Sequence, residues 1–213
     1  MHKRKIGLFF ILVVGIGLFT SISLTINSEF IKQFDMLIID SVQGMISTPL
    51  TSIMLFITFL GSVKGVIIIT VICAGIFCMS RNYLLGVYLI ISVGVGAGAF
   101  NRLLKAHFHR DRPDLLRIVH EHGFSFPSGH AMGSVILFGG IFYVIYRLIG
   151  SNRKTLILFM IAGIFILSIG LSRIYLGVHY PSDIIAGYAA GSVWVVLSVI
   201  IFRLYDKNVE SFK

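Results

Sequence analysis

Three short polar segments interrupt the apolar second half of this chain. They read KAHFHRDRP (residues 105–113), FSFPSGHAM (residues 124–132) and SRIYLGVHYPSD (residues 172–183). Each one lies where an apolar run begins or ends. Cationic side chains, backbone N–H groups at a helix start and neutral imidazoles can together bind a phosphate group and attack it. We therefore expect the three segments to converge on one phosphate group.

In the first segment, Lys105 and Arg112 are the candidate phosphate ligands. Lys105 ends an apolar run, and Pro113 stops any helix directly after Arg112. Arg can fork onto two phosphate oxygens, whereas Lys acts as a point charge. Two cations at the end of a membrane span could also simply reach the interface, but the density of basic residues here favours a multiply charged anion. Most of the surrounding basic residues are expected to be solvated in loops: Arg102, His107, His109, Arg110, Arg117, His120 and His122.

The second segment has the features of an anion site at a helix start. Ser128 follows Pro127 and is a good N-cap for the apolar helix that begins there. Gly129 would let a ligand approach the backbone, whose free N–H groups attract phosphate. His130 falls in the first turn of this helix. A histidine at a span end is often only interfacial, but beside Ser-Gly at a helix start it is a candidate for acid–base chemistry.

The third segment pairs a histidine with a carboxylate. Arg173 ends one apolar run, His179 lies in the following turn, and Pro181 opens the next run. Asp183 stands four residues after His179. An acid at a helix start could merely favour the helix dipole. A carboxylate within reach of an imidazole also fixes its tautomer and raises its basicity, so His179 and Asp183 are a candidate catalytic pair.

The composition identifies an integral membrane protein. Of 213 residues, 56% are hydrophobic and 13% are charged, whereas a soluble domain carries about 25% charged residues. The net charge of +9 is scattered between apolar runs, with no basic helix and no aromatic stacking platform. Nucleic-acid binding is therefore not expected, and an anionic ligand and the membrane topology explain the charge better.

We predict an all-α fold in which six transmembrane helices form one bundle. A span needs about 20 apolar residues. The small residues GVGAGA in the third span are expected to serve close helix packing. The candidates are Ile6–Leu24, Val63–Met79, Tyr83–Leu104, Ser128–Leu148, Thr155–Leu171 and Pro181–Leu204.

The segment Thr25–Ser62 between the first two spans allows two interpretations. It carries four charged residues among apolar ones and then an apolar run. It forms an amphipathic helix at the membrane surface followed by a helix packed at the outer face. Alternatively, the run Leu50–Leu60 begins a long, tilted second span.

The distribution of basic residues predicts the orientation. The start MHKRK resembles a signal peptide, but the apolar stretch continues to Ile26, which favours an uncleaved anchor. Basic residues prefer cytoplasmic loops, so the amino terminus is placed in the cytoplasm. Six spans then put both termini in the cytoplasm and all three polar segments on the outer face of the plasma membrane.

The spacing of these segments resembles the three-part motif of the type 2 phosphatidic acid phosphatase and haloperoxidase superfamily. Every motif position is matched, and with the six-span layout the resemblance covers nearly the whole chain. The matching residues are Lys105 with Arg112-Pro113, then Pro127-Ser128-Gly129-His130, then Ser172-Arg173 with His179 and Asp183.

The resemblance implies a metal-independent phosphohydrolase without cofactors. His179 would attack phosphorus, Asp183 would orient it, and His130 would protonate the leaving oxygen and later activate water. The phosphate would be held by Lys105, Arg112, Ser128, Gly129 and Arg173.

The resemblance also implies a membrane lipid substrate. Residues 1–213 would form a single integral membrane phosphatase domain whose motif-bearing core is 83–204. The expected substrates are phosphatidylglycerophosphate, phosphatidic acid or undecaprenyl diphosphate, and the oligomeric state is left open. Two alternatives are a vanadate-dependent haloperoxidase-like enzyme and a non-catalytic anion-binding membrane protein.

Overall fold

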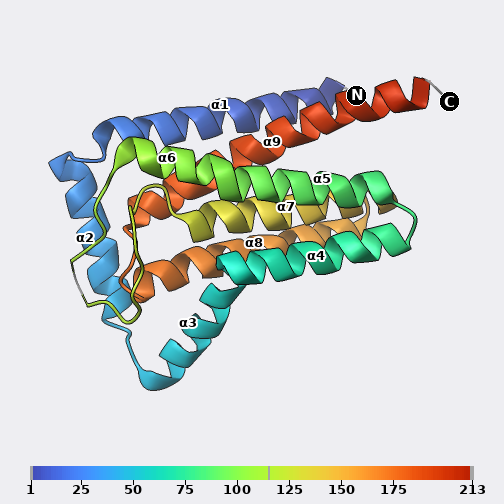
Figure 1. Ribbon diagram of the computed structural model, residues 1–213. Coiled ribbons are helices and arrows are strands. Elements are labelled where there is room, and N and C mark those ends of the chain that lie inside the picture. The colour runs from blue at the N-terminus through green and yellow to red at the C-terminus, as the bar shows by residue number, and fades with distance from the viewer. Residues whose placement is uncertain (1, 115, 212–213) are drawn as a thin grey trace.

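The computed structural model describes residues 2–114 and 116–211, with side chains described for 6–114 and 116–206, and this part of the chain is helical without strands. The predicted all-α class is thereby confirmed (Figure 1). In chain order the elements are α1 (His2–Thr25), α2 (Glu29–Gln43), α3 (Thr48–Gly61), α4 (Val63–Met79), α5 (Tyr83–Val93), the π-helix η1 (Gly94–Phe100), α6 (Asn101–Phe108), α7 (Gly129–Ile149), α8 (Arg153–Tyr175) and α9 (Pro181–Ser211).

Five helical stretches of the described chain are long and apolar enough to cross a membrane, and the count becomes six if α3 and α4 cross as one bent unit. The predicted boundaries agree with the structure to within a few residues. The helix α8 begins earlier and ends later than the predicted fifth span, and α9 continues beyond the predicted end of the sixth span at Leu204. A capping box, in which the Asn152 side chain and Thr155 bond reciprocally, fixes the start of α8 at Arg153.

The region between α1 and α4 contains two separate helices. In α2, Ile31, Asp35, Ile39 and Val42 are buried on one face, which makes the helix amphipathic as predicted. Figure 1 shows α2 lying across one end of the bundle. The break at Ser62 bends α3 from α4 by 57°. The structure therefore has two separate helices before α4, as the first interpretation expects, and a long second span beginning at Leu50 would have to be a bent one.

The central helix α7 packs against α9, α8 and α5. Its side chains Met132, Ile136 and Leu137 are fully buried. Gly187 lies where α9 approaches the start of α7, and a Cβ there would be only 2.9 Å from the Ser128 carbonyl oxygen. Small residues allow such close approach between membrane helices. The start of α9 is therefore held directly against the start of α7.

The small-residue run GVGAGA forms the π-helix between α5 and α6. Gly96 faces Trp194 of α9, and a Cβ on it would lie 2.3 Å from the indole Nε1. Trp194 also stacks on Phe100, with ring centroids 5.3 Å apart. The run thus serves close packing, as predicted, and it connects directly to the helix that carries Lys105.

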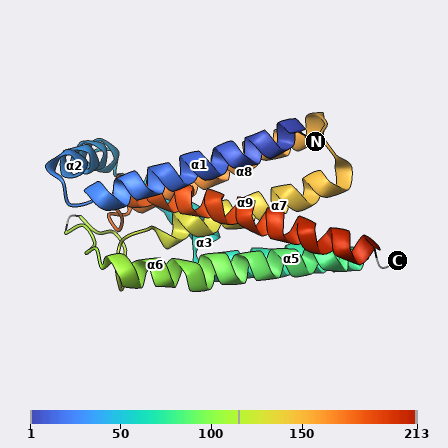
Figure 2. The same cartoon turned by 90° about the horizontal axis from the view of Figure 1, so that it is seen from above.

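Both ends of the described chain lie at one end of the bundle. In Figures 1 and 2, α1 begins and α9 ends at this end, whereas α2 and the loop between α6 and α7 lie at the other. All three polar segments lie at that opposite end. The second and third segments share this end because the chain runs away from it in α7 and returns to it in α8. The cytoplasmic location of the termini stays a prediction.

Candidate active site

Backbone hydrogen bonds tie the three polar segments to one another at this end of the bundle. The Ser125 N–H donates to the Arg110 carbonyl at 2.7 Å, which folds the α6–α7 loop back on itself. The Ser128 N–H donates to the Asp183 carbonyl at 3.1 Å and joins the start of α7 to α9. These bonds fix the side chains of segments that lie far apart in the sequence.

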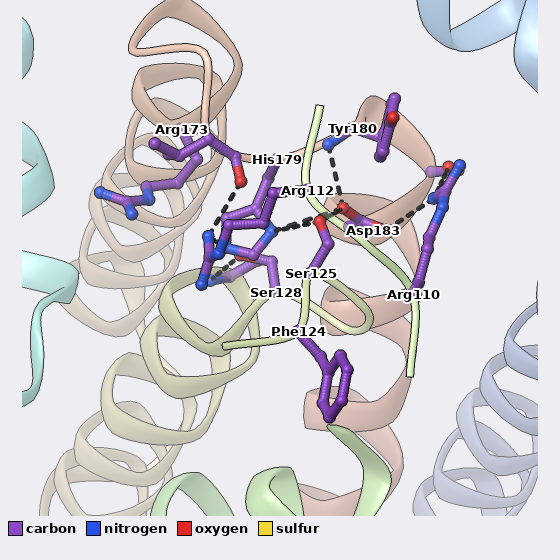
Figure 3. A network of polar contacts seen from close by, with 12 residues as sticks. Arg110, Arg112, Phe124, Ser125, Ser128, Arg173, His179, Tyr180 and Asp183 are labelled. Atoms are coloured by element: carbon purple, nitrogen blue, oxygen red, sulfur yellow. Dashed lines mark hydrogen bonds and ion pairs between the residues drawn. The ribbon is translucent and has the colours of Figure 1, made fainter. Parts of the chain in front are cut away.

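The imidazole of His179 is the centre of the site (Figure 3). It is 2% exposed. Its Nδ1 lies 3.4 Å from Oδ2 of Asp183, and its Nε2 lies 3.2 Å from a terminal nitrogen of Arg112. A guanidinium has donors only. The Nε2 atom must therefore present its lone pair to Arg112, and the Nδ1–H must point to the carboxylate side.

The surroundings of His179 keep its imidazole neutral. Burial lowers the pKa of His179 well below the ordinary value of 6.5, and the charges of Arg173, Lys105 and Arg112 lower this pKa further. At neutral pH the ring is therefore a free base. Its unprotonated Nε2 has the lone pair that a nucleophile requires.

Asp183 is fully buried and is held by several donors. The Tyr180 N–H donates to Oδ2 at 2.9 Å, and the Ser125 hydroxyl donates to the same oxygen. Arg110 donates to Oδ1 at 2.6 Å. Ser125 Oγ also lies 3.2 Å from Nδ1 of His179, so it bridges the histidine and the carboxylate. Figure 3 shows this network on one side of the imidazole.

On the other side of the imidazole, Arg112 donates to backbone carbonyls. Its side chain bonds the carbonyls of Gly123 and Val178, both at 2.9 Å, and that of His122 at 3.2 Å. Burial lowers the pKa of Arg112. Lys105 likewise donates to the carbonyl of Phe124. Among the described residues, the hydrogen-bond acceptors of these two cations are therefore neutral: they are backbone carbonyls and, for Arg112, also the lone pair of His179.

Arg173 is 1% exposed and closes the cationic side. It donates to the Thr58 hydroxyl at 2.7 Å and to Oε1 of Glu121 at 2.5 Å. Its Nε–H is buried without an acceptor among the described residues. The charge of Arg173 acts on both His130 and His179, so these groups share one electrostatic environment.

The start of α7 contributes Ser128, Gly129 and His130. Ser128 is the N-cap, as predicted, and its hydroxyl accepts from the Ala131 N–H at 3.4 Å. A Cβ on Gly129 would lie 3.0 Å from the Asn101 side-chain oxygen, so this glycine lets α6 approach. The structure shows no hydrogen-bond partner for the His130 ring among the described residues. The charges of Lys105 and Arg112 also act on that ring.

Sequence reasoning missed several residues of this network. Arg110 was expected to be solvated, but its side chain is only 11% exposed and bonds two buried carboxylates. One of these is Asp35, whose sequence signal is an acid on the apolar face of an otherwise amphipathic helix. Ser125, Glu121 and Thr58 had no local signal, because their partners lie on other elements. In the described part of the chain, no group of three or more His, Cys, Asp or Glu side chains could hold a metal ion.

The fold and this site define an integral membrane protein with a His–Asp pair beside a cluster of the cationic side chains Lys105, Arg112 and Arg173. A family model described as the PAP2 superfamily matches residues 82–207. The chain is 31% identical to phosphatidylglycerophosphatase B of Bacillus subtilis, over 77% of this chain and 79% of that protein. It therefore belongs to the PAP2 superfamily, and the resemblance drawn from the motifs is confirmed.

Two solved structures resemble the fold. One is the crystal structure of a transmembrane PAP2 type phosphatidylglycerolphosphate phosphatase from Bacillus subtilis, with a TM-score of 0.83, 26% identity, and coverage of 95% of this chain and 98% of that one. The other is LpxE of Aquifex aeolicus, with a TM-score of 0.62, 22% identity and coverage of 78% and 94%, which supports the fold alone. The chain is also 32% identical to a lipid A 1-phosphatase of Rhizobium johnstonii, over 55% of this chain and 48% of that protein.

Proposed function

We propose that this protein hydrolyses the terminal phosphate of a membrane lipid phosphate through a phosphohistidine intermediate. The observation that carries the proposal is the state of His179: its Nδ1–H faces Asp183, and its Nε2 lone pair faces the guanidinium of Arg112. The relatives named above are phosphatases of lipid substrates, which supports the lipid class. Candidate substrates are phosphatidylglycerophosphate, phosphatidic acid and undecaprenyl diphosphate.

Phosphate binding would use Lys105, Arg112 and Arg173. Hydrogen bonds from cations to a phosphate are stronger than those to neutral carbonyls, so an entering phosphate can take over the donors of Lys105 and Arg112. The unpartnered Nε–H of Arg173 is a further donor that a phosphate oxygen would satisfy. In this proposal the first-turn N–H groups of α7, with Ser128 and Gly129, add the positive end of the helix dipole.

In the first chemical step, the Nε2 atom of His179 attacks phosphorus as the bond from phosphorus to the lipid oxygen breaks. His130 gives a proton to that leaving oxygen. The Nδ1–H of His179 stays on the Asp183 side, where the carboxylate stabilises the positive charge that the phosphorylated imidazole acquires. The cations balance the charge on the equatorial oxygens.

In the second step, the neutral His130 takes a proton from water, and the resulting hydroxide equivalent attacks phosphorus. The bond between Nε2 and phosphorus breaks, which regenerates His179 and releases inorganic phosphate. The two steps together consume one water and return both histidines to their starting states. No metal takes part in this scheme, because three fixed cations supply the positive charge.

The position of the site fits a substrate that stays in the bilayer. The site lies at the end of the bundle remote from the chain ends. With both termini in the cytoplasm, it opens on the extracytoplasmic face of the plasma membrane. A headgroup could then enter the site while its apolar chains remain in lipid.

A phosphate-release assay tests this proposal. The purified chain in detergent mixed micelles should release inorganic phosphate from at least one of the three lipids, and competition among them in one detergent should rank them. Halide oxidation with added vanadate and peroxide would instead indicate a haloperoxidase. If none of the lipids loses phosphate, the proposed activity is wrong.

A further inference from the structure

The helix α2 contributes a charged residue to the site. Asp35 is fully buried, although it lies in a helix outside the residues 82–207 that match the family model. A buried carboxylate is costly unless it is paired and hydrogen-bonded. Asp35 is fully paired: Oδ1 accepts from the Ser182 N–H at 2.8 Å, and Oδ2 accepts from the Ser182 hydroxyl at 2.6 Å and from Arg110 at 2.9 Å.

Arg110 connects Asp35 to the catalytic pair. One terminal nitrogen bonds Asp35, and the other bonds Oδ1 of Asp183 at 2.6 Å and the Ser182 hydroxyl at 2.8 Å. The guanidinium also lies 4.0 Å above the centre of the Tyr180 ring. The side chain is thus fixed from three directions. Arg110 binds Oδ1 of Asp183, which leaves Oδ2 as the oxygen that faces Nδ1 of His179.

We propose that Asp35 is a positioning residue for the reaction: acting through Arg110, it fixes the rotation of the Asp183 carboxylate and thereby the Nδ1–H tautomer of His179. This inference rests on the proposed function only for the effect on turnover. The hydrogen bonds of Asp35 go to Ser182 and Arg110 and not to Lys105, Arg112 or Arg173, so it should not affect the affinity for the lipid phosphate.

Docking of α2 alone would not require this carboxylate. Ile31, Ile39 and Val42 already bury the apolar face of the helix, and an apolar or neutral residue at position 35 would extend that face without the desolvation cost of a charge. An apolar residue at position 35 would, however, no longer hold the guanidinium of Arg110 in place. Partners that orient a catalytic or metal-binding histidine change activity by about 10-fold to 100-fold when they are removed.

The test compares Asp35→Asn with Asp40→Asn, which removes the same charge from an exposed position of the same helix. Phosphate release from phosphatidic acid in mixed micelles is measured for the full chain. We expect Asp35→Asn to lower kcat about tenfold or more, with KM within about twofold because no ligand contact is lost. Asp40→Asn should behave like the wild type. An equal loss in both variants, or a rise in KM alone, would overturn the proposal.

A spectroscopic measurement separates positioning from folding and from activity. In protein labelled with ¹⁵N-histidine, the His179 signals are assigned by their loss in His179→Ala. We expect a single Nδ1–H tautomer at pH 7.5 in the wild type and in Asp40→Asn, and a tautomer mixture in Asp35→Asn. An unchanged tautomer in a folded Asp35→Asn protein contradicts the inference. If the wild type releases no phosphate, the proposed function fails, while this spectrum still decides the role of Asp35.

Ser182→Ala is the variant to test if Asp35→Asn does not fold. It removes one hydrogen bond to Asp35 and one to Arg110 without leaving a buried charge unpaired. We expect the same pattern at smaller size, with kcat about threefold lower and KM unchanged. A Ser182→Ala protein with wild-type kcat and a single His179 tautomer overturns the proposal.

Discussion

The two sides of the His179 imidazole differ in the partners that hold their charged side chains. On the Nδ1 side, Asp183 is held by Ser125, by the Tyr180 N–H and by an arginine that a second carboxylate fixes. On the Nε2 side, Arg112 and Lys105 are held by backbone carbonyls. Asp183 is thus paired with a charged group, whereas Arg112 and Lys105 donate to neutral acceptors. Arg173, the third cation, is the exception on its side, because it donates to Glu121.

This difference separates the part of the site that must stay fixed from the part that must exchange partners. Ion pairs that are buried and hydrogen-bonded are lost only at great cost, so the Nδ1 side keeps its geometry through turnover. Carbonyl partners are weaker, so Arg112 and Lys105 can transfer their hydrogen bonds to a phosphate. We therefore expect changes on the Nδ1 side to lower kcat and changes on the Nε2 side to affect substrate binding as well.

The largest effect is expected when the group between the two sides is removed. His179→Ala deletes the nucleophile, and we expect turnover to fall by about 10⁴-fold or more, as in other enzymes with covalent intermediates. The cationic side stays intact, so the folded variant should still bind orthovanadate. Substantial phosphate release by this variant would remove His179 from the nucleophilic role.

The Nε2 side is tested by Arg112→Lys. Lysine keeps the positive charge but lacks the planar fork that spans two phosphate oxygens. We expect kcat/KM to fall about 100-fold, as when one donor to a developing charge is lost, with a measurable rise in KM. Steady-state kinetics in mixed micelles gives both values. An unchanged KM would show that Arg112 does not contact the bound substrate.

The neutral state of His179 predicts the pH dependence. Burial and the nearby cations lower the pKa of His179, so the free base persists below pH 6.5 and is lost only at more acidic pH. Below that pKa, kcat/KM should fall about tenfold per pH unit. In the enzyme–substrate complex the bound phosphate offsets the nearby cations, and kcat should fall at alkaline pH when His130 loses its proton there, which gives a bell-shaped profile. A profile that is flat from pH 5 to 9 would count against the histidine pair.

A smaller effect is expected from Ser125→Ala on the Nδ1 side. The change removes one donor to Asp183 and the bridge to His179, while Tyr180 and Arg110 still hold the carboxylate. We expect kcat to fall about fivefold, below the usual range for loss of an orienting partner, with KM unchanged. A fall in affinity without a fall in kcat would contradict the division between the two sides.

The smallest effect is expected from removing metal ions. In the proposed scheme, three cationic side chains supply the charge that a metal ion would otherwise provide. Incubation with EDTA should therefore change the initial rate by less than about twofold. Full inhibition that Mg²⁺ reverses would show that the cationic side needs a metal ion as well.

The sequence predicted the meeting of the motifs because the physical rules behind it are local. Apolar run lengths define the spans, and an even count of spans places Lys105, His130 and His179 at the same end. The i, i+4 spacing brings His179 next to Asp183 across a helix start. Ser128 is recognisable as an N-cap from its neighbours alone.

The parts that could not be predicted depend on contacts between distant elements. The buried partner of Arg110 is Asp35, far earlier in the chain, and no spacing rule connects the two. A basic loop residue is usually solvated, so the expectation for Arg110 was wrong. The bend at Ser62 lies inside a mostly apolar stretch, where hydropathy alone does not show that α3 leaves the line of α4.

The π-helix Gly94–Phe100 has a consequence for Lys105. A π-turn has one residue more than an α-turn, so the chain beyond it is advanced relative to an uninterrupted helix. Each α-helical residue turns the chain by about 100° and advances it by about 1.5 Å. Shortening GVGAGA by a single residue would therefore rotate the ammonium group off the catalytic face, so the register of this one bulge determines which way the first phosphate ligand points.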